Sequence, residues 1–207
     1  SNGNWVEPFD PTSHNLSCFT EGSAWTYTFM VPHDMQGLIQ LTGGQKQFVN
    51  KLQQCFDEGH FDVTNEPDIA YPYLFNYVKG EEWRAQKTVR EIVETDFKNA
   101  PEGIPGNEDV GTLSAWLVYA MMGFYSDCPA NMEYQLTSPV FSKITIELDP
   151  DYYEGRQFVI EAPEASPDNM YIKSMRLNGR VHKKYTLHHN ELVKGGKLVY
   201  NLMNKKP

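Results

Sequence analysis

The chain has 207 residues, 40% of them hydrophobic and 13% aromatic, which is enough to bury a core and excludes a disordered tail. Its formal net charge of −9 argues against a nucleic-acid-binding protein, which would carry a basic face. No apolar run approaches the ~20 residues that a membrane-spanning helix needs, so the sequence predicts no membrane span.

The first part of the chain, up to residue 125, predicts helices because its apolar side chains recur at three- and four-residue spacing. Glycine and proline clusters, notably PEGIPG at 101–106, separate these helices. A short helix is expected at 34–41, with Asp34 as its N-terminal cap. The other predicted helices cover residues 48–56, 68–78, 83–97 and 113–124.

Beyond residue 126 the spacing of apolar residues falls to two, which predicts strands. Asn178-Gly179 is a strong signal for a tight turn between two of them. One helical turn is expected within 188–196, ended by a glycine pair. The predicted strands cover residues 143–148, 156–162, 170–177 and 197–202.

These patterns together predict an α+β protein. Antiparallel α/α helical hairpins come first, as residues 1–125, and a small antiparallel β-sheet unit follows, as residues 126–207. Helices that are paired through short loops are typical of a helical array or toroid, and the predicted helices are too few for a closed ring.

Two acids, Glu108 and Asp109, stand directly before the apolar helix in GNEDVGTLSAW at 106–116. In a structural interpretation, Asp109 caps a helix that begins near Val110, and Glu108 favours the positive helix end. In a functional interpretation, a carboxylate held at a loop–helix junction stays ionised and suits a general base or a calcium ligand. The two interpretations are compatible, and the sequence leaves both open.

A third acid, Glu21, is followed closely by aromatic residues that include Trp25. A carboxyl group among aromatic rings tends to stay protonated, as a general acid requires. Aromatic faces also offer a platform on which sugar rings can pack. The structural alternative is a loop glutamate beside core aromatics.

A polar pair, Asn65 and Glu66, precedes a proline at the predicted start of a helix. Ordinary helix-entry chemistry explains the pair equally well. The functional alternative is a site that binds a hydroxyl group or a cation.

Four stretches, taken together with two in the C-terminal part, resemble glycoside hydrolase family 92, the calcium-dependent exo-acting α-mannosidases. The order and the spacing of the stretches match that family, and the resemblance covers nearly the whole chain. The six stretches are TEGSAWTYTFMVPHDMQGLIQLTGG (20–44), NEPDIAYPYLFNY (65–77), RAQKTVREI (84–92), GNEDVGTLSAWLVYAMMGFY (106–125), SPVFSKITIEL (138–148) and MYIKSMRLNG (170–179).

The resemblance implies a fold larger than this chain. The family pairs an N-terminal β-sandwich with an (α/α)6 barrel, and the active site lies between them. Residues 1–125 would then be a partial barrel segment, and residues 126–207 a β segment packed on the barrel. The sandwich and the early barrel helices would be the missing partners of this chain.

The resemblance also implies roles for two of the acids. The family inverts the anomeric configuration; its general acid falls on Glu21 and its general base on Asp109. The base belongs to an acid-x-acid element whose first acid is replaced here by Asn107. This replacement would weaken base catalysis or calcium binding unless Glu108 or another group substitutes for the missing acid.

Calcium (Ca²⁺) is the implied cofactor, and terminal mannosides of glycans are the implied substrates. Candidate substrate contacts are Asn65, Glu66, Trp25 and Asn107; candidate metal ligands are Asp109 and Glu66. The family context implies a periplasmic or secreted protein. The chain on its own is expected to be inactive. Because Asn107 replaces an acid of the family, the alternative is a non-catalytic carbohydrate-binding protein or a degenerate paralogue of the same family.

Overall fold

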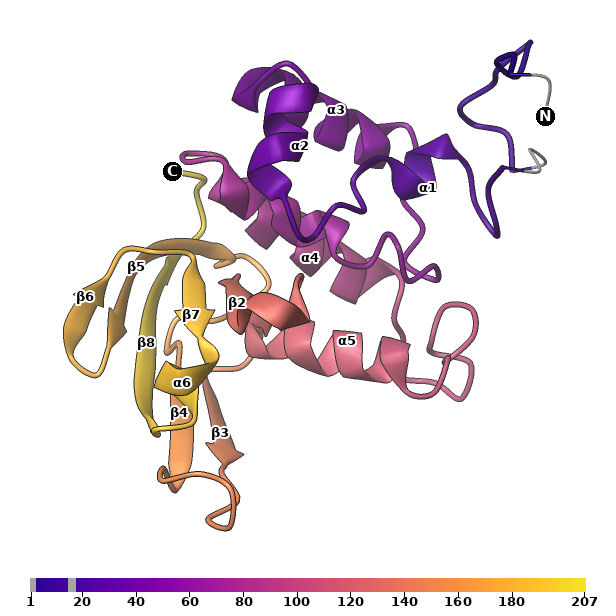
Figure 1. The fold of residues 1–207 in the computed structure, drawn as a ribbon. Helices are drawn as coiled ribbons and strands as arrows, with labels where there is room; N and C mark the ends of the chain where they lie inside the picture. Colours follow the sequence, from indigo (N-terminus) through magenta and orange to yellow (C-terminus); the bar gives the residue numbers. More distant parts are fainter. Residues whose placement is uncertain (1–2, 15–17) are drawn as a thin grey trace. The chain divides into compact units, whose positions relative to one another are not determined.

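The computed structural model describes residues 3–14 and 18–207 (Figure 1). The chain divides into two compact units, residues 1–69 and residues 70–207. Helices come first along the chain and most strands follow, so the predicted mixture of helices and sheets is confirmed.

The regular secondary structure among the described residues of the first unit is helical. The predicted cap of the second helix is confirmed, because the Asp34 carboxylate accepts a hydrogen bond from the Gly37 amide at 2.8 Å. The chain then turns through Gly43 and Gly44, whose φ values of 97° and 99° favour glycine over residues with a Cβ atom. The helices are α1 (Ala24–Thr28), α2 (Met35–Leu41) and α3 (Gln45–Asp57).

The core of this unit includes the predicted apolar stripe of α3. Its buried side chains are Phe48, Val49, Leu52 and Cys55, spaced as one face of an α-helix requires. Phe29, which follows α1, meets Phe48 edge-to-face with 5.8 Å between ring centroids. Burial of this stripe explains why α3 forms at the predicted place.

The second unit begins with a 3₁₀ helix, η1 (Tyr71–Tyr77), where an α-helix was predicted at 68–78. That prediction of helix type was wrong. Five successive side chains of η1, from Tyr71 to Phe75, are buried, so tertiary packing rather than an amphipathic stripe sets its backbone. Two regular helices follow, α4 (Glu82–Thr95) and α5 (Thr112–Met122).

Within residues 70–207 the strands form two sheets. The smaller sheet has the order β1-β2-β7 and is antiparallel, and the larger has the order β3-β4-β8-β5-β6. Two short helical turns, η2 (Pro129–Asn131) and α6 (His189–Leu192), lie between strands. The strands are β1 (Phe124–Tyr125), β2 (Glu133–Leu136), β3 (Lys143–Glu147), β4 (Gln157–Glu161), β5 (Tyr171–Leu177), β6 (Arg180–His182), β7 (Thr186–His188) and β8 (Gly196–Met203).

The larger sheet is mixed, so the prediction of a purely antiparallel sheet was wrong. β8 lies between β4 and β5 (Figure 1) and pairs with β4 in parallel, with Glu161 opposite Val199. The two-residue period of apolar side chains predicts a strand, but it carries no information on the direction of the neighbouring strand. The predicted tight turn is confirmed, because Asn178 and Gly179 join β5 to β6 with φ values of 50° and 79°.

Side chains of the second unit tie its helices to its strands. Gln86 on α4 accepts a hydrogen bond from the backbone amide of Ile172 on β5 at 2.7 Å. The buried Arg90 donates to the carbonyl oxygens of Pro139 at 3.0 Å and Ser166 at 3.2 Å. These contacts are partly or fully buried and join α4 to segments far along the chain, so helices and strands of residues 70–207 form one unit.

The sheet core is a continuous apolar cluster. Alternate residues of the central strands point into it, which is the expected result of a two-residue period. Among the described residues, no helix combines the length and the apolar character needed to cross a membrane. The cluster includes Phe124, Leu136, Phe158, Ile160, Ile172, Met175, Leu187, Leu198, Tyr200 and Leu202.

Candidate active site

Glu21 lies in a turn directly before α1, and the turn is held by local side chains. Its φ is 54°, in the left-handed region that residues with a Cβ atom seldom adopt. The Tyr27 hydroxyl donates to the Thr20 carbonyl at 2.5 Å, and Ser23 caps α1 by accepting from the Trp25 amide at 3.2 Å. The Glu21 side chain is exposed, so within this chain it is not enclosed by aromatic rings as the sequence suggested.

Trp25 carries a partly occupied aromatic surface. Its ring stacks on His60, with 4.5 Å between centroids and 14° between planes. The Lys51 ammonium lies 5.5 Å from the indole centroid. A sugar ring packed on Trp25 would therefore share the indole with these two side chains.

Asn65 and Glu66 lie in a turn that follows α3. The Asn65 amide nitrogen donates to the carbonyl oxygen of Glu21 at 2.5 Å, so this predicted site residue contacts the backbone of another one. The Glu66 carboxylate is exposed. The structure thus brings Glu21 and Asn65 together across 44 positions of sequence.

Asp68 completes this turn and was missed by the sequence analysis. Its side chain is fully buried, one carboxylate oxygen accepts from the Asp62 amide at 3.0 Å, and the other has no partner among the described residues. The pKa of Asp68 is raised to about 7, mainly by burial; the hydrogen bond from the Asp62 amide lowers this pKa, and the neighbouring Asp62 charge raises it, within that total. The only sequence signal was its place in the same NEPD turn as Asn65.

Asp109 lies just before α5 in a strained run of backbone. Asp109, Val110 and Gly111 have φ values of 46°, 60° and 88°, so three successive residues are left-handed. The helix begins at Thr112, and its N-terminal cap is Gly111, which supplies no side-chain hydrogen bond. The prediction that Asp109 caps a helix beginning near Val110 was therefore wrong, and its carboxylate is exposed.

Glu108 lies at the positive end of α5, as predicted, and it also bonds the first turn in place of Asp109. Its two carboxylate oxygens accept hydrogen bonds from the amide and the hydroxyl of Ser114, at 3.0 and 2.9 Å. Because Ser114 lies in the first turn of α5, this carboxylate meets the positive end of the helix. Asn107, the residue before it, is exposed.

The described residues contain no cluster of three or more histidine, cysteine, aspartate or glutamate side chains suited to a metal ion. The carboxylates proposed as ligands, Glu66 and Asp109, are both exposed. Their hard oxygen atoms suit calcium, which takes about 6–8 oxygen ligands. These side chains could therefore supply only part of a calcium ligand set.

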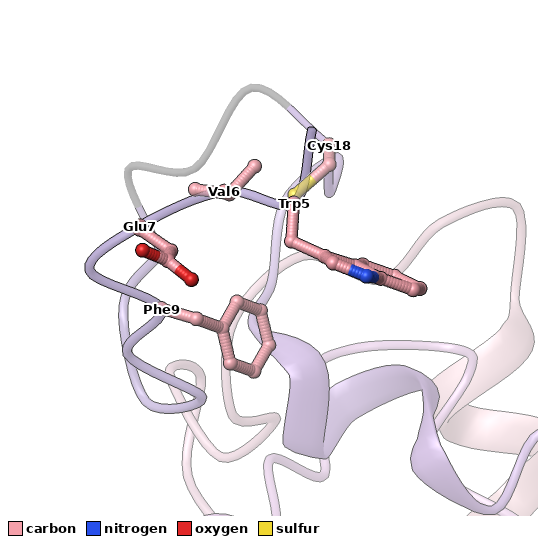
Figure 2. A pocket seen from close by; sticks show the side chains of 5 residues that line it. All are labelled: Trp5, Val6, Glu7, Phe9 and Cys18. Carbon is pink, nitrogen blue, oxygen red and sulfur yellow. The ribbon is translucent and has the colours of Figure 1, made fainter. Parts of the chain in front are cut away.

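A separate pocket lies on the N-terminal segment of the first unit (Figure 2). It is mainly apolar, and Trp5, 91% exposed, is its largest side chain. The pocket contains none of the residues predicted for catalysis or substrate binding. Its lining residues are Trp5, Val6, Glu7, Phe9 and Cys18.

Comparison with protein families gives a match over almost the entire chain. The sequence model described as the glycosyl hydrolase family 92 catalytic domain matches residues 1–204. A protein of Arthroderma benhamiae named "uncharacterized secreted glycosidase" is 29% identical over 193 residues, which cover 92% of this chain and 24% of the relative.

Solved structures of two mannosidases from Bacteroides thetaiotaomicron are similar in fold. A family GH92 α-mannosidase is 32% identical with a TM-score of 0.89, and the match covers 99% of this chain and 28% of that enzyme. A structure of the same enzyme in complex with mannoimidazole has a TM-score of 0.90 at 30% identity, over 99% of this chain and 29% of the other. A family GH92 inverting mannosidase is 32% identical with a TM-score of 0.87, over 98% and 30%. The chain thus spans less than a third of the length of these relatives.

Proposed function

Because the chain belongs to glycosyl hydrolase family 92, we propose that it is the C-terminal part of an inverting, calcium-dependent exo-α-mannosidase. Its substrates would be the terminal α-mannosides of glycans. The solved relatives support this proposal, since both are named as mannosidases, one as an inverting enzyme, and one was solved in complex with mannoimidazole. The name of the fungal relative supports a secreted protein, and we extend this to a secreted or periplasmic location.

The single observation that carries the proposal is the exposure and the backbone conformation of the two predicted catalytic acids. Glu21 and Asp109 both expose their carboxylates, and both hold left-handed backbone, with φ values of 54° and 46°. A residue with a Cβ atom keeps this conformation only where its surroundings hold it, and such positions gather at functional sites. This supports catalytic roles for both acids better than it supports two solvated loop residues.

In the proposed reaction, the protonated Glu21 donates its proton to the glycosidic oxygen as the bond from that oxygen to the anomeric carbon breaks. Asp109 accepts a proton from a water molecule, whose oxygen forms the new bond to the anomeric carbon on the opposite face of the sugar. The products are the shortened glycan and mannose of inverted configuration. Each carboxyl group then returns to its starting state by exchange of a proton with solvent.

Because Asn107 replaces the first acid of the acid-x-acid element, only one carboxylate of that element, Asp109, remains to act as the base in this proposal. Glu108 is the neighbouring acid, but both of its oxygens are bonded to Ser114, so it serves the helix. Asp109 would therefore act alone. The same observation favours the second candidate function, a non-catalytic carbohydrate-binding relative, in which the loss of one acid has removed turnover.

Calcium is proposed as the cofactor, with Glu66 and Asp109 as partial ligands. When bound, it would hold sugar hydroxyl groups and favour the flattened ring of the oxocarbenium-like state. The remaining role of this chain is to place the acid and the base.

Residues 1–125 are proposed to form part of an (α/α)6 barrel of helical hairpins, and residues 126–207 to form the β segment packed on it.

Stereochemistry tests this proposal. The intact enzyme that carries this segment is mixed with an α-linked mannobiose, and the first mannose released is followed by proton nuclear magnetic resonance. We expect β-mannose first, then slow mutarotation to the equilibrium mixture. The isolated chain of 207 residues is expected to release none. If α-mannose appears first, the inverting mechanism is wrong; if the intact enzyme binds mannobiose without turnover, the carbohydrate-binding alternative is correct.

A further inference from the structure

The turn that carries Glu21 is fixed by hydrogen bonds to its backbone. On its N-terminal side the Thr20 carbonyl accepts from the Tyr27 hydroxyl, and on its C-terminal side the Ser23 amide donates to the Thr26 hydroxyl at 3.1 Å. Both of these partners lie within the same short segment. The Glu21 carbonyl is different, because its donor is the Asn65 amide, 44 residues further along the chain.

The position of Asn65 is itself fixed. Its backbone amide donates to the Asp62 carbonyl at 3.1 Å, and its carbonyl accepts from the Asp68 amide at 3.0 Å. Asp68 is fully buried and closes the turn by accepting from the Asp62 amide. The Asn65 side chain therefore projects from a loop that is held at both ends.

The Glu21 backbone needs such a support. A φ of 54° is disfavoured for a residue with a Cβ atom and persists only where other contacts hold it. A change of φ or ψ at Glu21 would turn its side chain to a new direction, and misplacement of a catalytic group by about 1 Å can cost about 10²-fold in rate. The hydrogen bond from Asn65 thus bears on the direction of the carboxyl group without touching it.

We propose that Asn65 is a positioning residue for Glu21. Its side-chain amide donates to the Glu21 carbonyl and so keeps the carboxyl group of the general acid directed at the glycosidic oxygen. The inference rests on the proposed role of Glu21. It gives Asn65 a role other than the substrate contact expected from the sequence, and the two roles differ in their kinetic consequences.

Leaving-group chemistry separates the two roles. A general acid matters most where the departing oxygen is basic, as in an α-linked mannobiose, and little where fluoride leaves, as in α-mannosyl fluoride. Loss of a residue that acts through Glu21 should therefore lower kcat on mannobiose alone. Loss of a substrate contact should raise KM on both substrates.

The experiment measures kcat and KM of the intact enzyme on both substrates for Asn65→Ala, Glu21→Gln and the double variant. We expect Asn65→Ala to lower kcat on mannobiose about 10- to 100-fold and to change kcat on the fluoride less than about threefold. Its KM values should stay within about threefold of the wild type. Added to Glu21→Gln, it should cause no further loss on mannobiose, because the group through which it acts is already disabled.

Two further variants keep the test decisive. Gln54→Ala is the matched control, since it removes an exposed side-chain amide of α3 whose partner among the described residues is Glu58. It should leave the turnover of both substrates unchanged. If Asn65→Ala does not fold, Asn65→Asp keeps the size of the side chain and removes the donor, and the same pattern is expected.

The outcomes that overturn the inference are distinct from the failure of the proposed function. Full activity of Glu21→Gln on mannobiose would overturn the acid role itself, and the inference with it. If Glu21→Gln is impaired but Asn65→Ala raises KM alone, affects both substrates equally or adds its full loss to that of Glu21→Gln, Asn65 does not position the acid and the acid role stands.

Discussion

Left-handed backbone at Glu21, Asp109 and Val110 is costly for side chains of their size. Such conformations cost about 1–3 kcal/mol each and are kept only where surrounding contacts hold them. Val110 is branched at Cβ and fully exposed, so burial of its own side chain does not explain its conformation. Met132 and Asn178 are left-handed as well, with φ values of 56° and 50°, and Asn178 belongs to the tight turn between β5 and β6. The other three residues lie at, or next to, the two acids proposed for catalysis.

Asp68 gives a prediction about stability and pH. Its pKa is about 7 in the folded protein, above the ordinary value of 3.8, so the folded state holds the proton more tightly than the unfolded state. The protonated Asp68 therefore contributes fully to the free energy of unfolding below about pH 4. This contribution is lost as the pH rises through 7, and the free energy of unfolding falls by up to about 1.4 kcal/mol per pH unit. Asp68→Asn, which resembles the protonated acid, should remove this dependence.

The measurement is chemical unfolding of wild type and Asp68→Asn between pH 4 and pH 8. The variant should gain in free energy of unfolding relative to the wild type as the pH rises. Asp57→Asn, an exposed aspartate at the end of α3, is the control and should show no such gain. A constant difference between Asp68→Asn and the wild type at all pH values would mean that Asp68 stays ionised when buried.

At the scale of elements, the first turn of α5 is bonded by the side chain of Glu108 and not by the side chain of its N-cap residue, Gly111. Glu108 bonds both the amide and the hydroxyl of Ser114, whereas the cap, Gly111, offers no side chain. This arrangement leaves the Asp109 carboxylate unused by the helix. A structural acid and an acid free for chemistry are thus adjacent in the sequence.

Glu108→Ala should destabilise the protein by about 1 kcal/mol, because the first turn of α5 loses its side-chain acceptor. Asp109→Ala should cost less, since its carboxylate makes no cap. Equilibrium unfolding in urea measures both, with Glu102→Ala in the exposed turn before α5 as the control. A larger loss for Asp109→Ala than for Glu108→Ala would contradict the assignment of these two acids.

The long helices and strands were predictable because each buries one face, so that apolar residues recur at a regular spacing along its sequence. The helices α2 to α5 and the strands β3, β4, β5 and β8 lie close to the predicted ranges. Short elements such as α1 and β1 carry too few residues for a period to show. The direction of β8 beside β4 depends on contacts between distant segments, which no local pattern records.

Motifs in the sequence indicate candidate site residues, but they do not indicate the contacts of these residues. The roles that the motifs indicate for Glu21, Asn65 and Asp109 stay predictions. The bond from Asn65 to the Glu21 carbonyl and the burial of Asp68 arise from the way distant turns fold. That Glu108 and not Asp109 bonds the first turn depends on where α5 begins, and helix ends are the least regular part of the pattern.

At the scale of the whole molecule, the chain covers 28–30% of the solved mannosidases that it resembles. Glycan hydrolysis is therefore proposed for the intact enzyme. Calcium dependence also belongs at this scale, because the exposed carboxylates of Glu66 and Asp109 could supply only part of a ligand set.

Removal of calcium gives a direct prediction. Dialysis of the intact enzyme against a chelator should lower kcat/KM on mannobiose at least about tenfold, and calcium should restore it better than magnesium, which prefers a rigid octahedral site. Parallel unfolding curves, with and without calcium, separate a loss of catalysis from a loss of stability. Unchanged turnover after complete removal of calcium would show that the cofactor assignment is wrong.

The most direct test of the central claim is the turnover of mannobiose by the intact enzyme and by its Glu21→Gln and Asp109→Asn variants. General acid and base catalysis contribute about 10²–10⁴-fold each, so both variants should lose at least about 100-fold in kcat while they remain folded. Glu102→Gln, an exposed glutamate outside the predicted site, should keep the wild-type rate. Wild-type turnover by either Glu21→Gln or Asp109→Asn would contradict the assignment of the acid and the base.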